Sequence, residues 1–423
     1  LTKLELDKVL ALLADHASSP AAKERCLAVR PLDDAEDIWL LQAQTSAACK
    51  LITLKGSPSF GGIVDVGASL SRADRGGCLS PEELLRVATV LKAARTAKEY
   101  AEGDAVESGL DIFFRQLTPN KFFEERIFTS ILSKDEIADA ASSELASIRR
   151  KIRQQSSKIR ESLQKIITSP TYAKILQEPI VTIRSDRFVV PVKAECKGSL
   201  PGLVHDISSS GATLFVEPMG VVQANNELKE LQAREEREIE RILRQLSADC
   251  GDQMENILYD YDILVHLDVI FARAQLSYQM SAARPEVRRR GGIVLRRARH
   301  PLLDPAKAVP ISVELGQQFD TLVITGPNTG GKTVTLKTLG LLCLMAQCGL
   351  HIPADDGSVV RVFDRVLADV GDEQSIEQSL STFSAHMANI VQILQQADEQ
   401  SLLLFDELGA GTDPVEGAAL AIA

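Results

Sequence analysis

The chain has 423 residues, a length that suits two or three domains, each with its own core. Its 45% hydrophobic and 25% charged residues are typical of a globular protein, and the formal net charge of -11 argues against a uniformly basic nucleic-acid coat. Seven scattered cysteines without a C-x-x-C pair indicate free thiols rather than a disulfide framework or a zinc site.

No apolar run reaches transmembrane length and no signal peptide opens the sequence, so we expect a cytoplasmic protein with no membrane partner. The first residue is Leu1, and residues 417–423 read as the beginning of a helix. We therefore expect the chain to be part of a longer protein.

Residues 1–135 are predicted to be mostly helical. Leucines and a valine cluster on one side of a first helix between Leu4 and Leu13. A second start signal lies at residues 80–100, where Ser80 is a preferred N-cap and Pro81 suits the first turn. No residue in this region carries a recognisable chemistry, which favours a helical scaffold.

Residues 136–168 show a seven-residue repeat of apolar side chains, typical of a coiled coil and free of glycine and proline. The predicted arm would be roughly 50 Å long at 1.5 Å per residue. Residues 221–248 have a second apolar stripe and are predicted to return antiparallel to the first arm. The members of the repeat are Leu145, Ile152, Ile159 and Ile166.

A small β-rich tip is predicted between the two arms, at about residues 179–217. Two strands flank a turn at Ser185–Asp186, and two more lie on either side of Gly211. Four basic residues fall within a short part of this tip, and we interpret them as a phosphate-gripping surface, with a solvated surface as the alternative. They are Arg184, Arg187, Lys193 and Lys197.

Another helix is predicted over residues 252–284, and Pro285 ends it. From Val287 onward the pattern changes to strands, at residues 292–298, 309–315 and 321–325. This change predicts an α/β domain that runs to the end of the chain.

The glycine-rich stretch from residue 326 fits the P-loop spacing G-x-x-x-x-G-K-[ST], between a predicted strand and a predicted helix. Its backbone N–H groups would bind the phosphates of ATP at a helix N-terminus. Lys332 would face the β- and γ-phosphates, and the Thr333 hydroxyl would bind Mg²⁺. The predicted nucleotide-binding residues are Gly326, Pro327, Asn328, Thr329, Gly330, Gly331, Lys332 and Thr333.

The apolar run at residues 401–405 is predicted to be a strand that delivers Asp406 and Glu407 to a sheet edge. We expect Asp406 to hold Mg²⁺ and Glu407, together with Lys332, to be catalytic, with Glu407 positioning the attacking water. An acidic pair after a strand is otherwise often a solvated turn.

A helix is predicted between these motifs, with Ser381 or Thr382 as its N-cap. From spacing alone it is equally well an ordinary capped helix or one whose N-terminus receives the γ-phosphate of a neighbour's ATP. His300 is a candidate neighbour of the adenine, whereas His205, His351 and His386 are interpreted as structural or surface histidines.

Residues 326–354, 369–387 and 402–414 resemble the ATPase of the MutS family. Residues 186–231 are similar to the second bacterial branch of that family, which suppresses recombination and acts on collided ribosomes. The resemblance implies an all-α lever core with an inserted antiparallel coiled-coil arm carrying a β tip, followed by an α/β P-loop ATPase domain of the ABC type.

In chain order the resemblance implies a lever core at 1–135, a clamp arm at 136–250, a returning lever helix at 251–285 and the ATPase domain at 286–423. It also implies a homodimer that acts on branched DNA, a stalled ribosome and its rRNA, or both. A signature helix would complete the partner subunit's ATP site through Ser381, Thr382, Phe383 and Ser384.

No part of the sequence matches the family's mismatch-reading domain, and residues 122–126 (FFEER) lie in a predicted helix rather than in that domain's motif. The branch's nuclease module is expected to follow Ala423. A chromosome-condensing ATPase of the SMC kind would have its coiled coil between the two ATP motifs, whereas both arms here precede the P-loop. A nucleotide-binding scaffold without activity and a small-molecule kinase are further alternatives.

Overall fold

The computed structural model describes residues 2–102, 109–326, 331–370 and 379–408, with 415, 417 and 419, except for the side chains of 379–386. The described chain forms two compact units. Unit 1 comprises residues 1–65, 90–119 and 258–423, and unit 2 comprises residues 66–89 and 120–257.

The predicted ranges 1–135, 136–250, 251–285 and 286–423 stay a prediction, and unit 1 combines residues from the first, third and fourth of them. The reason is packing within unit 1, because the first helices of the chain pack against the helix that follows the P-loop. The Cδ1 atom of Leu4 would lie 2.9 Å from a Cβ added to Gly340 on that helix. The residues from 286 onward therefore share a core with the N-terminal residues.

Two helices of unit 1, α5 and α10, also contain residues that are assigned to unit 2. Gln42 on α3 donates hydrogen bonds to the carbonyl oxygens of Ala346 and Leu350, which ties the N-terminal helices to the ATPase region. The helices are α1 (Leu6–His16), α2 (Pro20–Leu27), α3 (Ala35–Lys55), α5 (Pro81–Ala101), α6 (Asp111–Gln116), α10 (Met254–Gln279), α11 (Lys332–Gln347) and α12 (Ser379–Gln396), with a 3-10 turn at Thr2–Leu4.

The described residues of unit 1 form two sheets. The first has the order β7-β10-β8-β9, in which β10 is parallel to β7 and antiparallel to β8. The second pairs β11 and β12 in parallel. The strands are β7 (Glu286–Arg288), β8 (Ile293–Ala298), β9 (Ile311–Leu315), β10 (Val359–Arg361), β11 (Arg365–Asp369) and β12 (Ser401–Phe405).

The strand predicted at residues 321–325 is wrong, because these residues have no strand assignment. Val323 is 76% exposed. A run of β-branched residues favours extended backbone but becomes a strand only beside a pairing partner, and the described part of the chain supplies none here.

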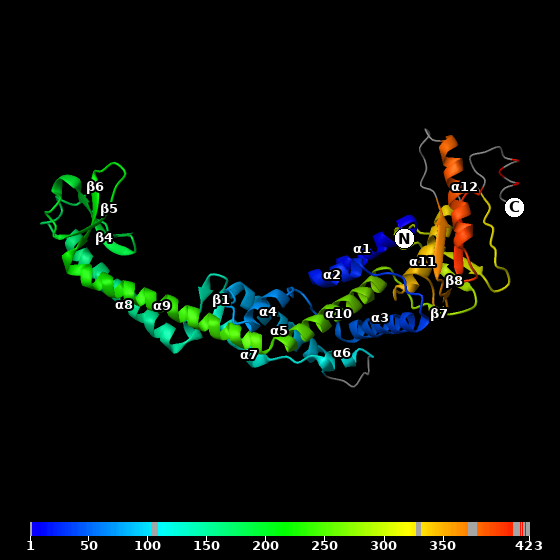
Figure 1. Ribbon diagram of the computed structural model, residues 1–423, viewed down its shortest axis with the longest axis horizontal. Helices are drawn as coiled ribbons and strands as arrows, with labels where there is room; N and C mark the ends of the chain where they lie inside the picture. The colour runs from blue at the N-terminus through cyan, green and yellow to red at the C-terminus, as the bar shows by residue number, and fades with distance from the viewer. Residues whose placement is uncertain are drawn as a thin grey trace. The chain divides into compact units, whose positions relative to one another are not determined.

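Unit 2 is built around two long antiparallel helices. In Figure 1, α8 (Ser143–Ile167) and α9 (Met219–Asp252) lie side by side, with the strands of a small sheet at one end. The remaining elements are α4 (Gly67–Asp74), α7 (Lys121–Ser130), β1 (Ile131–Ser133), β2 (Glu136–Ile137), β3 (Thr182–Arg184), β4 (Arg187–Lys193), β5 (Gly202–Ile207) and β6 (Thr213–Pro218), with 3-10 turns at Asp139–Ala141 and Ala194–Cys196.

The first arm is shorter than predicted. Residues 131–137 form a hairpin, and α8 starts after Ser142, whose hydroxyl accepts a hydrogen bond from the Leu145 N–H at 2.9 Å. This N-cap fixes the start of the helix, so its 25 residues span roughly 37 Å instead of 50 Å. Leu145 and Ile159 of the predicted repeat are buried, whereas Ile152 is only half-buried.

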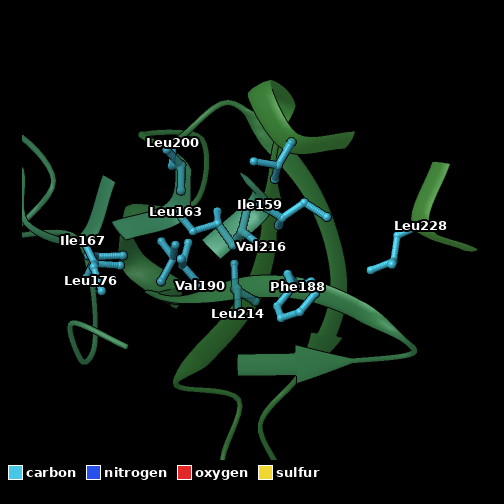
Figure 2. Close-up of a cluster of buried hydrophobic side chains, with 12 residues drawn as sticks. Ile159, Leu163, Ile167, Leu176, Phe188, Val190, Leu200, Leu214, Val216 and Leu228 are labelled. Carbon is cyan, nitrogen blue, oxygen red and sulfur yellow. The ribbon is translucent and has the colours of Figure 1, made fainter. Parts of the chain in front are cut away.

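The sheet at the end of the two helices has the order β3-β4-β6-β5 and is antiparallel throughout. Its four strands and the turn at Ser185–Asp186 confirm the predicted strand pattern, and both turn residues have positive φ. Figure 2 shows how one face of the sheet packs against α8 and α9. The buried side chains there include Ile159, Leu163, Phe188, Val190, Leu214, Val216 and Leu228.

The start signal at Ser80 is also confirmed. Ser80 N–H donates to Glu83 Oε2 at 2.9 Å, and Glu83 N–H donates to Ser80 Oγ at 3.3 Å, which is a reciprocal capping box. Among the described residues, no helix is long and apolar enough to cross a membrane. All seven cysteines are free thiols.

Candidate nucleotide site

The P-loop helix α11 begins at Lys332, directly after Gly331. Gly331 has φ 77° and ψ 23°, a left-handed conformation that residues with a Cβ rarely adopt. Because the first N–H groups of a helix have no partner within it, this end of α11 suits an anion. Pro327, Asn328, Thr329 and Gly330 lie outside the described residues.

Thr333 and Asp406 meet at the end of β12. The Thr333 hydroxyl donates a hydrogen bond of 2.5 Å to Asp406 Oδ2, although 73 residues separate the two in sequence. Packing explains the approach, because Gly340 on α11 leaves room for Leu404 on β12. A Cβ at Gly340 would lie 2.5 Å from Leu404 Cδ1. Two of the predicted site residues are thus brought together.

Glu407 follows Asp406 and is exposed, with φ 50°. A left-handed backbone is uncommon for glutamate, and such conformations often occur at functional sites. Lys332, at the first position of α11, is half-buried.

Asp369 is a site residue that the sequence reasoning missed. It ends β11 directly beside Phe405 on β12, it is 5% exposed, and its carbonyl oxygen accepts the Asp406 N–H at 2.9 Å. Asn389 on α12 donates its side-chain N–H to Asp369 Oδ1 at 2.6 Å. Asp369 therefore connects α12 with the strand end that carries Asp406. The signal available in the sequence was an acid directly after a second apolar strand.

His300 is 8% exposed, and burial lowers its pKa. Its Nε2 atom lies 3.9 Å from Glu5 Oε2, and Lys337 Nζ on α11 lies at the same distance from that oxygen. A hydrogen bond from Lys8 lowers the pKa of Glu5. The structure thus gives His300 a contact with Glu5, the residue before α1, and its predicted place near an adenine stays a prediction.

The donor set at Thr333 and Asp406 fits Mg²⁺ bound to a nucleotide. Among the described residues, no group of three or more His, Cys, Asp or Glu side chains could hold a metal ion. Mg²⁺ in nucleotide sites is usually held by one or two protein oxygens together with phosphate oxygens and waters. A hydroxyl and a carboxylate beside a helix N-terminus provide that arrangement.

A family model described as MutS domain V matches residues 322–423, which include all of these site residues except His300, Glu5 and the N-terminal contacts. Proteins named Endonuclease MutS2 from Acetivibrio thermocellus and Alkaliphilus oremlandii are each 50% identical over 99% of this chain, covering 53% and 54% of their own lengths. The protein of that name from Geobacillus thermodenitrificans is also 50% identical over 99% of this chain and 54% of its own length.

The chain belongs to the MutS family. More narrowly, it belongs to the second bacterial branch, as the resemblance predicted. It spans about half the length of the curated relatives that it matches.

The helix predicted between the two ATP motifs corresponds to α12, Ser379–Gln396, and its part as a signature helix stays a prediction. The predicted N-cap at Ser381 or Thr382 is wrong, because the helix already includes Ser379 and both residues lie within it. The side chains of Ser381, Thr382, Phe383 and Ser384 lie outside the described part of the structure. On the described part of α12, Ile393 is buried and Leu394 is 56% exposed.

The four basic residues predicted at the MutS-family clamp tip have different environments. Arg187 donates to Glu217 at 2.8 and 3.0 Å and to Asn226 at 2.6 Å. Glu217 is fully buried, so Arg187 makes a structural contact inside the tip. Arg184 lies over the Phe215 ring at 4.4 Å and 3.4 Å from Asp206. Lys193 is half-buried and Lys197 is exposed.

Proposed function

We propose that this chain binds and hydrolyses Mg²⁺-ATP at the site formed by α11 and β12. The observation that carries the proposal is the 2.5 Å contact between the Thr333 hydroxyl and Asp406. It unites the Mg²⁺-binding residues of a P-loop ATPase at the N-terminus of the P-loop helix.

Each residue has a distinct part in the proposed reaction. The glycines at 326 and 331 allow the backbone to turn around the phosphates, and Lys332 binds the β- and γ-phosphates as a point charge. Thr333 and Asp406 hold Mg²⁺, which when bound neutralises the charge that develops on the phosphate oxygens. Glu407 orients the attacking water and accepts its proton.

The experiment is a titration of the purified chain with a fluorescent ATP analogue, comparing the wild type with Lys332→Ala. We expect the variant to lose affinity for the triphosphate while it retains some through the backbone cradle. Exposed Lys307→Ala, which lies before the P-loop, is the matched control and should bind like the wild type. Unchanged affinity in a folded Lys332→Ala protein would contradict the assignment.

We further infer a homodimer in which Ser381, Thr382, Phe383 and Ser384 act on the partner subunit's ATP. This inference rests on the MutS-family assignment. The link from Asn389 to Asp369 supports it, because it couples α12 to the strand end that carries Asp406. A movement of α12 would therefore shift the strand end that carries Asp406.

We also propose that the two-helix unit is a clamp for nucleic acid, either branched DNA or the rRNA of a stalled ribosome, in the cytoplasm. Along α8 there are seven Lys or Arg residues against two acids, which suits contact with phosphates in a chain of net charge -11. Of the tip residues, we assign phosphate contact to Arg184, Lys193 and Lys197 and a structural part to Arg187. The relatives are named endonucleases, and we propose no nuclease role for residues 1–423.

A further inference from the structure

The protein has one tryptophan, Trp39, and it borders a cleft in unit 1. The cleft measures about 460 Å³, within the size range of sites for small organic ligands. Its lining comes from α3 and from the chain around β7 and β10 and consists of Trp39, Gln42, Arg284, Pro285, Glu286, Val287 and Gly357. None of the described P-loop residues, Gly326 and residues 331–333, contributes to it.

The indole of Trp39 is held in place with part of its surface open. Its Nε1–H donates to the Val287 carbonyl oxygen at 2.7 Å, and the side chain is still 42% exposed. The Arg289 guanidinium lies 5.8 Å from the centre of the ring and is also paired with Glu36 at 2.9 Å. A fixed, half-exposed aromatic ring beside a cleft is a ready stacking surface for another planar group.

Two arginines at this cleft have no carboxylate partner among the described residues. Arg284 lines the cleft and is exposed. Arg296 is also exposed, and its Nη1 atom would lie 3.5 Å from a Cβ added to the cleft residue Gly357. The one acid in the lining, Glu286, is occupied by Arg288 at 2.7 and 2.9 Å. The available charge at the cleft is therefore positive and suits an anionic group.

Gln42 lines the cleft from α3 and is held in one orientation. Its side chain is fully buried, and its amide nitrogen donates to the carbonyl oxygens of Ala346 at 3.0 Å and Leu350 at 2.8 Å. These two bonds fix the amide orientation, and Oε1 is left without a hydrogen-bond partner in the described part of the protein. Because this oxygen is itself buried, Gln42 closes the inner side of the cleft, and the residues that a ligand can reach are Trp39 and the two arginines.

The geometry points to a second nucleotide site at this cleft, separate from the P-loop, that takes an unpaired nucleotide. The base stacks on Trp39, and its phosphate is bound by Arg284 and Arg296. The ligand is either a free nucleotide or one unpaired residue of a single-stranded nucleic acid, since both present a base and a phosphate. The inference requires neither ATP hydrolysis nor the clamp.

Tryptophan fluorescence tests this directly, because all of the signal comes from Trp39. The purified chain is titrated with a single-stranded DNA of about ten nucleotides, with the abasic strand of equal length, and with a 5′-mononucleotide. We expect quenching by the strand that carries bases and not by the abasic strand. Equal affinity for the mononucleotide identifies a free nucleotide as the ligand, and much tighter binding of the strand identifies single-stranded nucleic acid.

Variants separate the cleft from other binding sites. Arg284→Gln combined with Arg296→Gln should weaken the quenching titration on the order of tenfold and reduce its salt dependence. The exposed Arg115→Gln on α6 is the matched control and should behave like the wild type. Lys332→Ala should leave the quenching unchanged.

Three results would overturn the inference. One is the absence of quenching at concentrations where anisotropy shows that labelled DNA is bound. Another is equal quenching by the abasic strand. The third is loss of quenching in Lys332→Ala, which would assign the signal to the P-loop.

Discussion

Replacing Glu217 by glutamine is expected to loosen the sheet at the tip of unit 2. Glu217 is 0% exposed and accepts hydrogen bonds from Arg187 at 2.8 Å and from Asn225 at 2.7 Å, with His205 Nε2 at 2.5 Å. The amide keeps the shape of the side chain and removes its charge, so the Arg187 guanidinium loses its counter-ion in a largely buried place.

Removal of one partner of a buried ion pair typically costs about 3–5 kcal/mol. The Arg187 side chain keeps 18% of its exposure and a hydrogen bond to Asn226, so we expect a smaller loss, about 2–3 kcal/mol. This loss corresponds to a roughly 30- to 150-fold faster exchange of protected amides through local opening.

Hydrogen exchange of the amides in β4 and β6 is the suitable assay, because it reports local opening without treating the whole chain as one cooperative unit. Glu195→Gln removes the same charge from an exposed position of the tip and is the control. Protection in Glu217→Gln equal to that in Glu195→Gln would refute the view that the Glu217–Arg187 pair holds the tip together.

Three further changes have defined outcomes. Burial raises the pKa of Glu83, but hydrogen bonds from the Ser80 backbone, Arg72 and other groups outweigh burial and lower that pKa to about 2. The stability that ionised Glu83 contributes to the fold is therefore complete above pH 4.5, its ordinary pKa, and is lost as the pH falls toward 2. Glu83→Gln should therefore remove part of the acid dependence of unfolding in that window, and an unaltered pH profile would contradict this. A Ser384→Ala and a Lys332→Ala protein, each inactive alone, should partly restore ATP hydrolysis when mixed, whereas no gain would indicate a site complete within one subunit. Replacing Arg184, Lys193 and Lys197 together by glutamine should weaken nucleic-acid or ribosome binding. The slope of log affinity against log salt concentration should fall by up to about three. A preserved slope would exclude the tip as the surface that binds phosphates.

The motifs with local signatures were predictable from the sequence. The helix start at Ser80 and the turn at Ser185–Asp186 depend on neighbouring residues, and both occur as expected. The parallel strand that delivers Asp406 was also predictable, because its apolar run is bounded by polar residues. In these cases short-range backbone chemistry determines the outcome.

Features that depend on distant partners were not predictable. Arg187 looked like a surface cation because the sequence does not reveal that the pairing of β4 with β6 brings Glu217 next to it. Residues 321–325 have the composition of a strand, but a strand also needs a neighbour. Asp369 was missed because its position beside Asp406 follows from the register of β11 with β12.

At the start of the first arm, two local sequence signals predict different first residues for the helix. The heptad pattern predicts a helix that starts near residue 136. The N-cap at Ser142 and the pairing of Ile131 with Ile137 instead make the helix start at Ser143. The N-cap and the hairpin give the backbone groups of these residues hydrogen-bond partners, so a longer helix is not needed to satisfy them.

The most direct test of the account is ATP binding and turnover by Glu407→Gln, measured side by side with the wild type in a chain that hydrolyses ATP. The amide retains the shape of the side chain and loses the carboxylate that positions water. We predict Mg²⁺-dependent ATP binding of wild-type affinity with turnover lost by a factor on the order of a hundred or more. Turnover at the wild-type rate would place the catalytic base elsewhere and contradict the assignment of the site at the end of β12.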